Sequence, residues 1–164
     1  MAADGTSLEA EPIKDKKEIK VSALREGTVI DHLAPGSALR VLQILGITSG
    51  RTVTLGLNLE SRKLGQKDLV KIESRELTQH EVNKIAILSP HATISIIRDF
   101  EVVEKIVPRI PEVLENMVRC GNPACISNVD HRVQTRFRVV RDQPLRVRCH
   151  YCERAFREEE IELL

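Results

Sequence analysis

Hydrophobic and polar positions change their period several times along the first hundred residues. Residues 20–24 ("KVSAL") and 27–33 ("GTVIDHL") are short and mainly apolar, which is typical of extended segments. Residues 35–37 ("PGS") then predict the start of a helix that ends at Gly46. One side of this helix would carry Leu39, Leu42 and Leu45.

Residues 51–59 ("RTVTLGLNL") alternate strictly between apolar and other positions. One face of this segment would carry Val53, Leu55, Leu57 and Leu59, and the other Thr52, Thr54 and Asn58. This alternation predicts a half-buried strand. Residues 67–73 ("KDLVKIE") follow as a second strand after a turn near Gly65.

Thr78 and Glu81 have the spacing of a capping box, which predicts the start of a second helix. Leu77 and Val82 can form the hydrophobic staple around it. This helix is expected to end before Pro90 and to bury Val82, Ile85 and Ala86. Two further strands are predicted over residues 93–97 ("TISII") and 100–106 ("FEVVEKI").

The order strand, helix, two strands, helix, strand predicts a ferredoxin-like α+β sandwich, in which two helices cover one face of an antiparallel sheet. Residues 1–17 have few large hydrophobic side chains to bury and are expected to form a disordered tail. Pro108 and Pro111 interrupt regular structure. We therefore predict one domain over residues 18–107 and a second over residues 108–164.

Charged residues make up 30% of the chain and nearly cancel to a net charge of +1, which favours neither a nucleic-acid nor a membrane partner. No apolar run approaches the roughly 18 residues that a membrane-spanning helix needs. The N-terminal residues carry charges where a signal peptide would be apolar. The expected compartment is the cytoplasm, where thiols stay reduced.

The four cysteines fall into two pairs. Cys120 and Cys125 form a C-x4-C motif, and Cys149 and Cys152 form a C-x-x-C motif after a gap of 23 residues. Four thiolates at about 2.3 Å satisfy the tetrahedral preference of Zn²⁺ and leave no open position, so the predicted site is structural. Two disulfides are the competing interpretation, which a reducing compartment disfavours. A redox C-x-x-C would need a thioredoxin-like βαβ context, which is absent around Cys149.

The cysteine-containing segment of about 45 residues cannot bury much core, so metal binding should supply much of its folding free energy. We predict a small all-β domain of the zinc-ribbon or rubredoxin-like type. His131 and His150 lie near the cysteines in sequence but are not needed as ligands.

Four ionisable residues of the first domain are candidates for ligand binding. Asp31 and His32 end an apolar strand, and they form either a solvated strand end with a helix-capping acid or the polar floor of a ligand site. Lys71 and Lys105 are either exposed strand lysines or cations placed to screen phosphate charge. Together the four would suit a nucleoside polyphosphate.

Nine arginines lie between Arg119 and Arg157. Such a cluster can bind nucleic acid with salt-sensitive affinity, although aromatic residues for base stacking are limited to Phe137, Tyr151 and Phe156. It can equally pair with carboxylates at a protein interface. The chain has no nucleophile, P-loop or metalloprotease motif, and each cysteine is assigned to the metal, so independent enzymatic activity is not expected.

Four stretches carry a resemblance to a known family: "REGTVIDH", "TLGLNL" followed by "GQKDLVKIE", "FEVVEK", and "CGNPACIS" with "CHYCERAF". With these in order, the sequence resembles the regulatory chain of aspartate carbamoyltransferase over everything after its N-terminal tail. The resemblance implies a non-catalytic subunit that forms a homodimer through its N-terminal domain and binds ATP or CTP there, with UTP assisting CTP. Its zinc domain would dock on catalytic chains, so that three regulatory dimers join two catalytic trimers in pyrimidine biosynthesis.

The resemblance also implies roles for individual residues. The nucleotide site would consist of Val21, Ala23, Leu24, Val29, Asp31, His32, Lys71, Ser95, Phe100, Val102 and Lys105. Phe100 stands where the family has a tyrosine and Ser95 where it has an asparagine, and both changes bear on the preference between ATP and CTP. The contact with the catalytic chain would include Asn122, Glu153 and Arg154. Arg154 replaces a common lysine, and Ala124 replaces a second asparagine.

Two other functions remain open from the residues alone. The first is a zinc-ribbon protein that binds nucleic acid through its arginines. The second is a stand-alone ligand-sensing domain that binds nucleotides without a catalytic partner.

Overall fold

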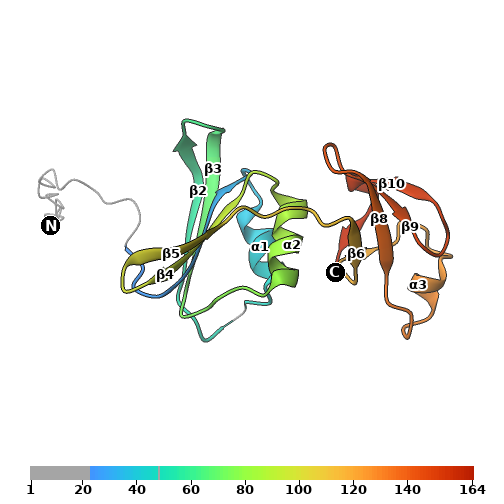
Figure 1. The fold of residues 1–164 in the computed structure, drawn as a ribbon, viewed down its shortest axis with the longest axis horizontal. Coiled ribbons are helices and arrows are strands. Elements are labelled where there is room, and N and C mark those ends of the chain that lie inside the picture. The colour runs from blue at the N-terminus through green and yellow to red at the C-terminus, as the bar shows by residue number, and fades with distance from the viewer. Residues whose placement is uncertain (1–22, 48) are drawn as a thin grey trace, which may run out of the picture.

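The structure is a computed structural model that describes residues 23–47 and 49–164. The expected tail, most of the expected segment 20–24 and the candidate residue Val21 lie outside the described residues. Within the described part, a larger α/β unit and a smaller β unit are joined by an extended stretch that follows β5 (Figure 1). No helix among these residues combines the length and the apolar character needed to cross a bilayer.

The N-terminal unit is a five-stranded antiparallel sheet with two helices on one face (Figure 1). The strand order is β2-β3-β1-β4-β5. The strands are β1 (Gly27–Leu33), β2 (Val53–Ser61), β3 (Gly65–Glu73), β4 (Thr93–Arg98) and β5 (Glu101–Ile106), and the helices are α1 (Ala38–Ile44) and α2 (Gln79–Leu88). This arrangement confirms the predicted ferredoxin-like sandwich, to which β5 adds an edge strand.

Helix α2 begins as its sequence predicts. The Thr78 hydroxyl accepts a hydrogen bond from the Glu81 N–H at 3.3 Å, and the Glu81 carboxylate accepts one from the Thr78 N–H at 2.8 Å. Leu77 and Val82 both pack against the core of this unit. The helix buries Val82, Ile85 and Ala86 and ends at Leu88, before Pro90.

Helix α1 faces the sheet partly as predicted, because Leu42 and Leu45 pack against the core and Leu39 does not. It buries Ala38 and Val41, and Leu45 directly after it is also buried, whereas Leu39 is 56% exposed. Ala38, Val41 and Leu45 are spaced by three and four residues, so they define the inner side, and Leu39 lies about 100° away from Ala38 around the axis. Gly46 ends the helix as predicted, with a positive φ of 59°.

Strand β2 is also exposed where burial was predicted. Leu55 and Leu57 are 37% and 48% exposed, although Val53 packs against the core. Two features explain this difference. The strand lies at the edge of the sheet, and its register with β3 shifts between Gly56 and Leu59. Asn58, at this irregularity, has a positive φ of 53°, which breaks the strict alternation.

The C-terminal unit is a small, mostly β structure. A four-stranded sheet has the order β10-β9-β8-β6, and a two-stranded sheet pairs β11 with β7. These strands are β6 (Val113–Glu115), β7 (Val118–Arg119), β8 (Arg136–Arg141), β9 (Arg146–Cys149), β10 (Ala155–Arg157) and β11 (Glu162–Leu163), with a short helix α3 (Ile126–Val129) and a 3-10 turn η1 (Glu158–Glu160). Its core is built around Leu114, Phe137, Val147 and Phe156.

The two units touch through helix α2. Ile87 of α2 is buried against the core of the C-terminal unit rather than its own. The Lys84 Nζ of the same helix donates a hydrogen bond to the carbonyl oxygen of Leu164 at 2.5 Å. The last residues of the chain therefore lie against the N-terminal unit.

Candidate functional site

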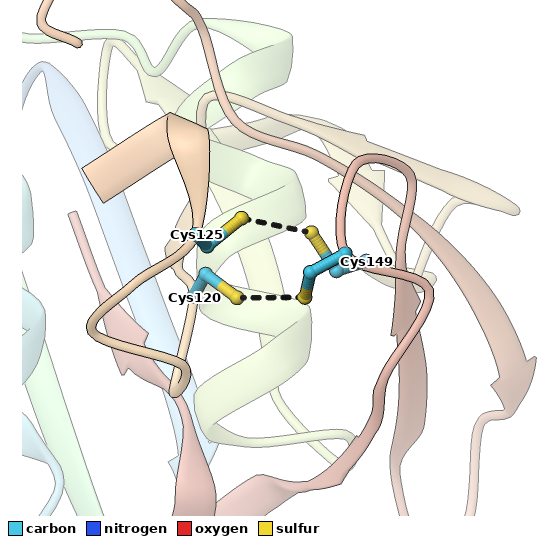
Figure 2. Close-up of side chains that lie close together, drawn as sticks. Cys120, Cys125 and Cys149 are labelled. Carbon is cyan, nitrogen blue, oxygen red and sulfur yellow. Dashed lines mark hydrogen bonds between the residues drawn. The ribbon is translucent and has the colours of Figure 1, made fainter. Parts of the chain in front are cut away.

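The four cysteines come from two tight turns that face each other. Cys120 follows β7 and Cys125 precedes α3, while Cys149 ends β9 and Cys152 lies in the turn that leads to β10. Figure 2 shows the sulfur atoms of these two turns pointing toward one another. The predicted pairing of the C-x4-C and C-x-x-C motifs at one place is confirmed.

The sulfur atoms have the spacing of a tetrahedral metal site. Their ligand atoms all lie within 4.8 Å of one another, and the Sγ–Sγ distances are 3.7 Å for Cys120–Cys152 and 3.7 Å for Cys125–Cys149. A regular tetrahedron with metal–sulfur bonds of about 2.3 Å has edges of about 3.8 Å. A disulfide would need about 2.05 Å. The cysteines are therefore free thiols arranged to hold one metal ion.

Hydrogen bonds fix the first turn. The Asn128 side-chain amide donates to the carbonyl oxygens of Cys120 at 2.7 Å and Asn122 at 2.8 Å. The Cys125 N–H donates to the Asn122 carbonyl at 3.0 Å. In the second turn, the Glu153 N–H donates to the Cys149 carbonyl at 3.1 Å, and Glu153 has a positive φ of 58°. The Asn128 side chain and backbone hydrogen bonds thus hold the two turns, which leaves the thiols available to the metal.

The environment of the thiols sets how tightly they hold protons without a metal. Burial raises the pKa of Cys120 and Cys149 above the ordinary thiol value. Burial also acts to raise the pKa of Cys125, but hydrogen bonds from the Ser127 side chain and backbone outweigh it and lower that pKa to about 7. A metal ion must therefore displace protons from Cys120 and Cys149 when it binds.

The second candidate site lies on the sheet of the N-terminal unit. The strand register places Thr54 opposite Lys71, Lys71 opposite Val29, Val29 opposite Ser95 and Ser95 opposite Lys105. Val70 and Ile72, the neighbours of Lys71, are buried against the helices, so this row lies on the other face of the sheet. Burial lowers the pKa of Lys71. The register thus brings four of the candidate residues, Val29, Lys71, Ser95 and Lys105, into one line.

Asp31 and His32 lie on β1, beside this row. The Lys67 Nζ is 2.8 Å and 2.9 Å from the two carboxylate oxygens of Asp31. His32 has a positive φ of 57°, its N–H donates to Asp31 Oδ1 at 2.6 Å, and its Nδ1 is buried without a hydrogen-bond partner. Asp31 therefore has an ion pair with a residue that the sequence analysis did not single out.

The acid that caps helix α1 is Asp68 rather than Asp31. Asp68 Oδ2 accepts hydrogen bonds from the N–H groups of Gly36 at 2.8 Å and Ala38 at 3.2 Å. The simpler interpretation of Asp31 as a capping residue is therefore wrong. Lys67 and Asp68 could have been noticed as charged residues within an apolar strand, but only the register shows what they contact.

The remaining candidates lie near the ends of the sheet. Leu24 is buried and Ala23 is exposed. Phe100 and Val102 are 64% and 59% exposed, and the Phe100 N–H donates to the Arg25 carbonyl at 3.0 Å. The described contacts do not join these positions to the polar row.

The candidate interface residues all belong to the cysteine turns. Asn122 lies in the first turn, and Glu153 and Arg154 in the second. Two of the three aromatic side chains near them are unavailable to bases, because Phe137 and Phe156 are buried. The Tyr151 hydroxyl donates to the Gln134 carbonyl at 2.8 Å. The stacking surface that single-stranded nucleic acid needs is therefore reduced to one ring.

Comparison with known proteins also divides the chain into an allosteric part and a metal-binding part. Residues 19–109 match the family model described as aspartate carbamoyltransferase regulatory chain, allosteric domain, and residues 112–162 match the metal binding domain of the same chain.

The chain is also similar to curated regulatory chains along most of its length. It is 54% identical over 147 residues to the aspartate carbamoyltransferase regulatory chain of Pyrococcus abyssi, covering 88% of this chain and 96% of the relative. The regulatory chain of Methanothrix thermoacetophila is 49% identical over 151 residues, covering 91% and 98%. That of Methanothermobacter thermautotrophicus is 46% identical over 151 residues, covering 92% and 97%. With its allosteric domain and its four-cysteine metal-binding domain, the chain belongs to the family of aspartate carbamoyltransferase regulatory chains.

Proposed function

We propose that this regulatory chain binds ATP and CTP, with UTP as a further effector, and thereby tunes catalytic chains of aspartate carbamoyltransferase in cytoplasmic pyrimidine biosynthesis. The observation that carries the proposal is the polar row across the sheet, with Lys71 and Lys105 on either side of Val29 and Ser95. Cations on two strands of the same sheet face suit a ligand that combines a neutral base and sugar with a polyphosphate.

Each group has a role in this proposal. Asp31 and Lys71 would face the ribose, and Lys105 and His32 the phosphates. Backbone groups around Leu24 and Phe100 would contact the edge of the base, between side chains of Ala23, Val29 and Val102, and Val21 would complete this border. Ser95 offers a hydroxyl near the centre of the row. Since Asp31 is paired with Lys67 at 2.8 Å, its carboxylate has a defined position before any ligand arrives.

The metal is proposed to be a single Zn²⁺, since four thiolates are its preferred structural ligand set. Its role is to hold the two turns that carry Asn122, Glu153 and Arg154 against the catalytic chain. We further propose that the N-terminal domain forms the homodimer and that three such dimers join two catalytic trimers. The domain limits of 18–107 and 108–164 belong to the same proposal. They agree with the apolar core of the metal-binding domain, whose residues all lie at or beyond Ile110 except Ile87.

An effector can change activity only if it binds two quaternary states with different affinities, and such coupling is typically about 1–3 kcal/mol. The decisive experiment is to titrate ATP, CTP and UTP into an assembly reconstituted from this chain and its catalytic chain. Aspartate saturation curves would be recorded at each nucleotide concentration. Shifts of half-saturation support the proposal, and curves that no nucleotide moves would overturn it.

The position of the phosphates has a separate test. Lys105→Ala should weaken binding of a triphosphate far more than binding of the corresponding nucleoside, because only the triphosphate carries charge for Lys105 to screen. Lys63→Ala is the matched control, since Lys63 is an exposed lysine in the turn between β2 and β3. Equal losses for both ligands would mean that the phosphates lie elsewhere.

A further inference from the structure

The outer face of the four-stranded sheet in the metal-binding domain is lined with arginines. Phe137 and Val147 point into the core and are fully buried, so their neighbours along β8 and β9 point outward. These neighbours are Arg136 and Arg138 on β8 and Arg146 and Arg148 on β9, and all four are exposed. The face is thus cationic along both central strands.

The register puts like charges directly opposite each other. Arg138 is the partner of Arg148, and Arg141 is the partner of Arg146. Like charges at directly opposed positions of an antiparallel pair destabilise the sheet. The chain therefore carries an internal repulsion on this face that external anions would relieve.

Three nearby arginines have their charge compensated within the domain, whereas Arg138 and Arg148 do not. Arg132 pairs with Asp130 at 2.8 Å, Arg136 with Glu115 at 3.4 Å, and Arg157 with Glu159 at 3.5 Å. Among residues 23–47 and 49–164, Arg138 and Arg148 have neither an ion pair nor a side-chain hydrogen bond. Their guanidinium groups are therefore available to a partner.

A groove lies over this pair. It has a volume of about 400 Å³, and its lining includes Val113, Arg136, Arg138, Arg148, His150 and Glu153. The volume is enough for more than one side chain of a docked segment. Arginine presents a planar fork that binds a carboxylate through two parallel hydrogen bonds.

We propose that this groove receives an acidic segment of the catalytic chain, whose carboxylates pair with Arg138 and Arg148. The inference rests on the proposed docking of the metal-binding domain. Glu153, one of the candidate interface residues, lines the same groove, so the arginine pair extends that interface from the cysteine turns onto the sheet. A protein partner is favoured over single-stranded nucleic acid because Phe137 and Phe156 are buried and offer no stacking surface.

The test compares two variants with the same change in net charge. Arg138→Gln/Arg148→Gln removes the uncompensated pair, and Arg132→Gln/Arg157→Gln removes two arginines that already have ion pairs. The dissociation constant of the zinc-loaded full chain for the purified catalytic subunit is measured over a series of NaCl concentrations. We expect the first variant to bind about tenfold or more weakly at low salt, with a smaller salt dependence, and the control to stay within about twofold.

A third variant separates the effect of charge from the effect of the planar guanidinium group. Arg138→Lys/Arg148→Lys keeps both charges but loses the forks, so its affinity should fall between those of wild type and the glutamine variant. Zinc content and melting temperature are measured for all proteins. The glutamine variant should melt no lower than wild type because the repulsion is gone. The proposal would be overturned if the glutamine variant melted at a lower temperature than wild type while the lysine variant bound the catalytic subunit as tightly as wild type does.

The outcomes distinguish this inference from the proposed function. If wild type binds the catalytic subunit and both substituted pairs bind equally well at every salt concentration, the inference is wrong and the proposed function stands. If wild type does not bind, the proposed function itself fails. If instead a DNA duplex binds and is released by the Arg138→Gln/Arg148→Gln change, the groove is a nucleic-acid site and the inference is overturned.

Discussion

Asp68 is a fully buried carboxylate that joins three elements of the allosteric domain. From β3, its Oδ2 accepts hydrogen bonds from the N–H groups of Gly36 and Ala38 at the start of α1, and its Oδ1 accepts one from the N–H of Asn58 in β2 at 3.0 Å. A buried charge is costly unless hydrogen bonds compensate it. Asp68 therefore holds both the start of α1 and the irregular part of β2 in place.

Replacing Asp68 with Ala should reduce the free energy of unfolding by about 3 kcal/mol, because it leaves buried backbone donors unsatisfied at about 1–3 kcal/mol each. The change is measured by urea unfolding of the metal-loaded chain. Asp68→Asn keeps one acceptor oxygen and should lose less. A loss below about 1 kcal/mol for the alanine variant would show that water or other groups satisfy these donors.

Gly121 marks a close approach of two chain segments in the metal-binding domain. A Cβ at this position would lie 2.3 Å from the Glu160 carbonyl oxygen and 3.0 Å from the Phe156 ring. Gly121→Ala should therefore force the first cysteine turn away from the C-terminal segment and weaken metal binding, as measured by competition with a chelator. Gly56→Ala is the control, because its contact is with the flexible side chain of Leu59 in the other domain. Equal metal affinity in both variants would contradict this account.

At the scale of elements, short sequence motifs predicted the features that depend on neighbouring residues alone. The capping box of α2, the four strands β1, β3, β4 and β5 and the end of α1 at Gly46 all follow from short-range chemistry. The exposure of Leu39 on α1 and of Leu55 and Leu57 on β2 does not, because the first depends on packing against the sheet and the second on an edge position and a register shift. A strict alternation of leucines cannot reveal a strand irregularity that Asp68, ten residues away, helps to hold.

The capping box gives the element-scale prediction. Thr78→Ala removes the acceptor for the Glu81 N–H and should cost about 1 kcal/mol of stability. Thr78→Ser keeps the hydroxyl and should be close to wild type. Both are measured by thermal unfolding, and an alanine variant as stable as the serine variant would mean that the Arg75–Glu81 ion pair at 2.6 Å suffices to hold the first turn.

At the scale of the whole molecule, the two sites differ in how far sequence could predict them. The cysteine spacing predicted the metal site because a tetrahedral ion accepts few arrangements of ligands. Lys71 and Lys105 were candidates from the residues alone, but Val29 and Ser95 needed the resemblance, since the four are distant in sequence and become neighbours only through the strand register. Lys67 was missed for the same reason, because only the folded sheet places it against Asp31.

The metal site makes the stability of the metal-binding domain depend on pH, and this dependence has opposite signs in the metal-loaded and metal-free chain. Without metal, the pKa values of Cys120 and Cys149 are raised above the ordinary thiol value, so their contribution to stability is present below that value and is lost as pH rises through the raised pKa. With metal, the fold requires thiolates, so its stability is lost as pH falls. Apparent metal affinity should rise by about two or more powers of ten per pH unit between pH 6 and 7, since at least these two thiols release protons.

Chelator competition across that range, with proton release followed in weak buffer, measures this dependence. Stripping the metal at neutral pH should unfold the metal-binding domain and expose Ile87, while the sheet of the allosteric domain remains folded because its core is separate. Circular dichroism and amide exchange would show whether protection is lost only beyond residue 110. A metal-free chain that kept full protection there would show that the apolar core around Phe137 holds this domain without the ion.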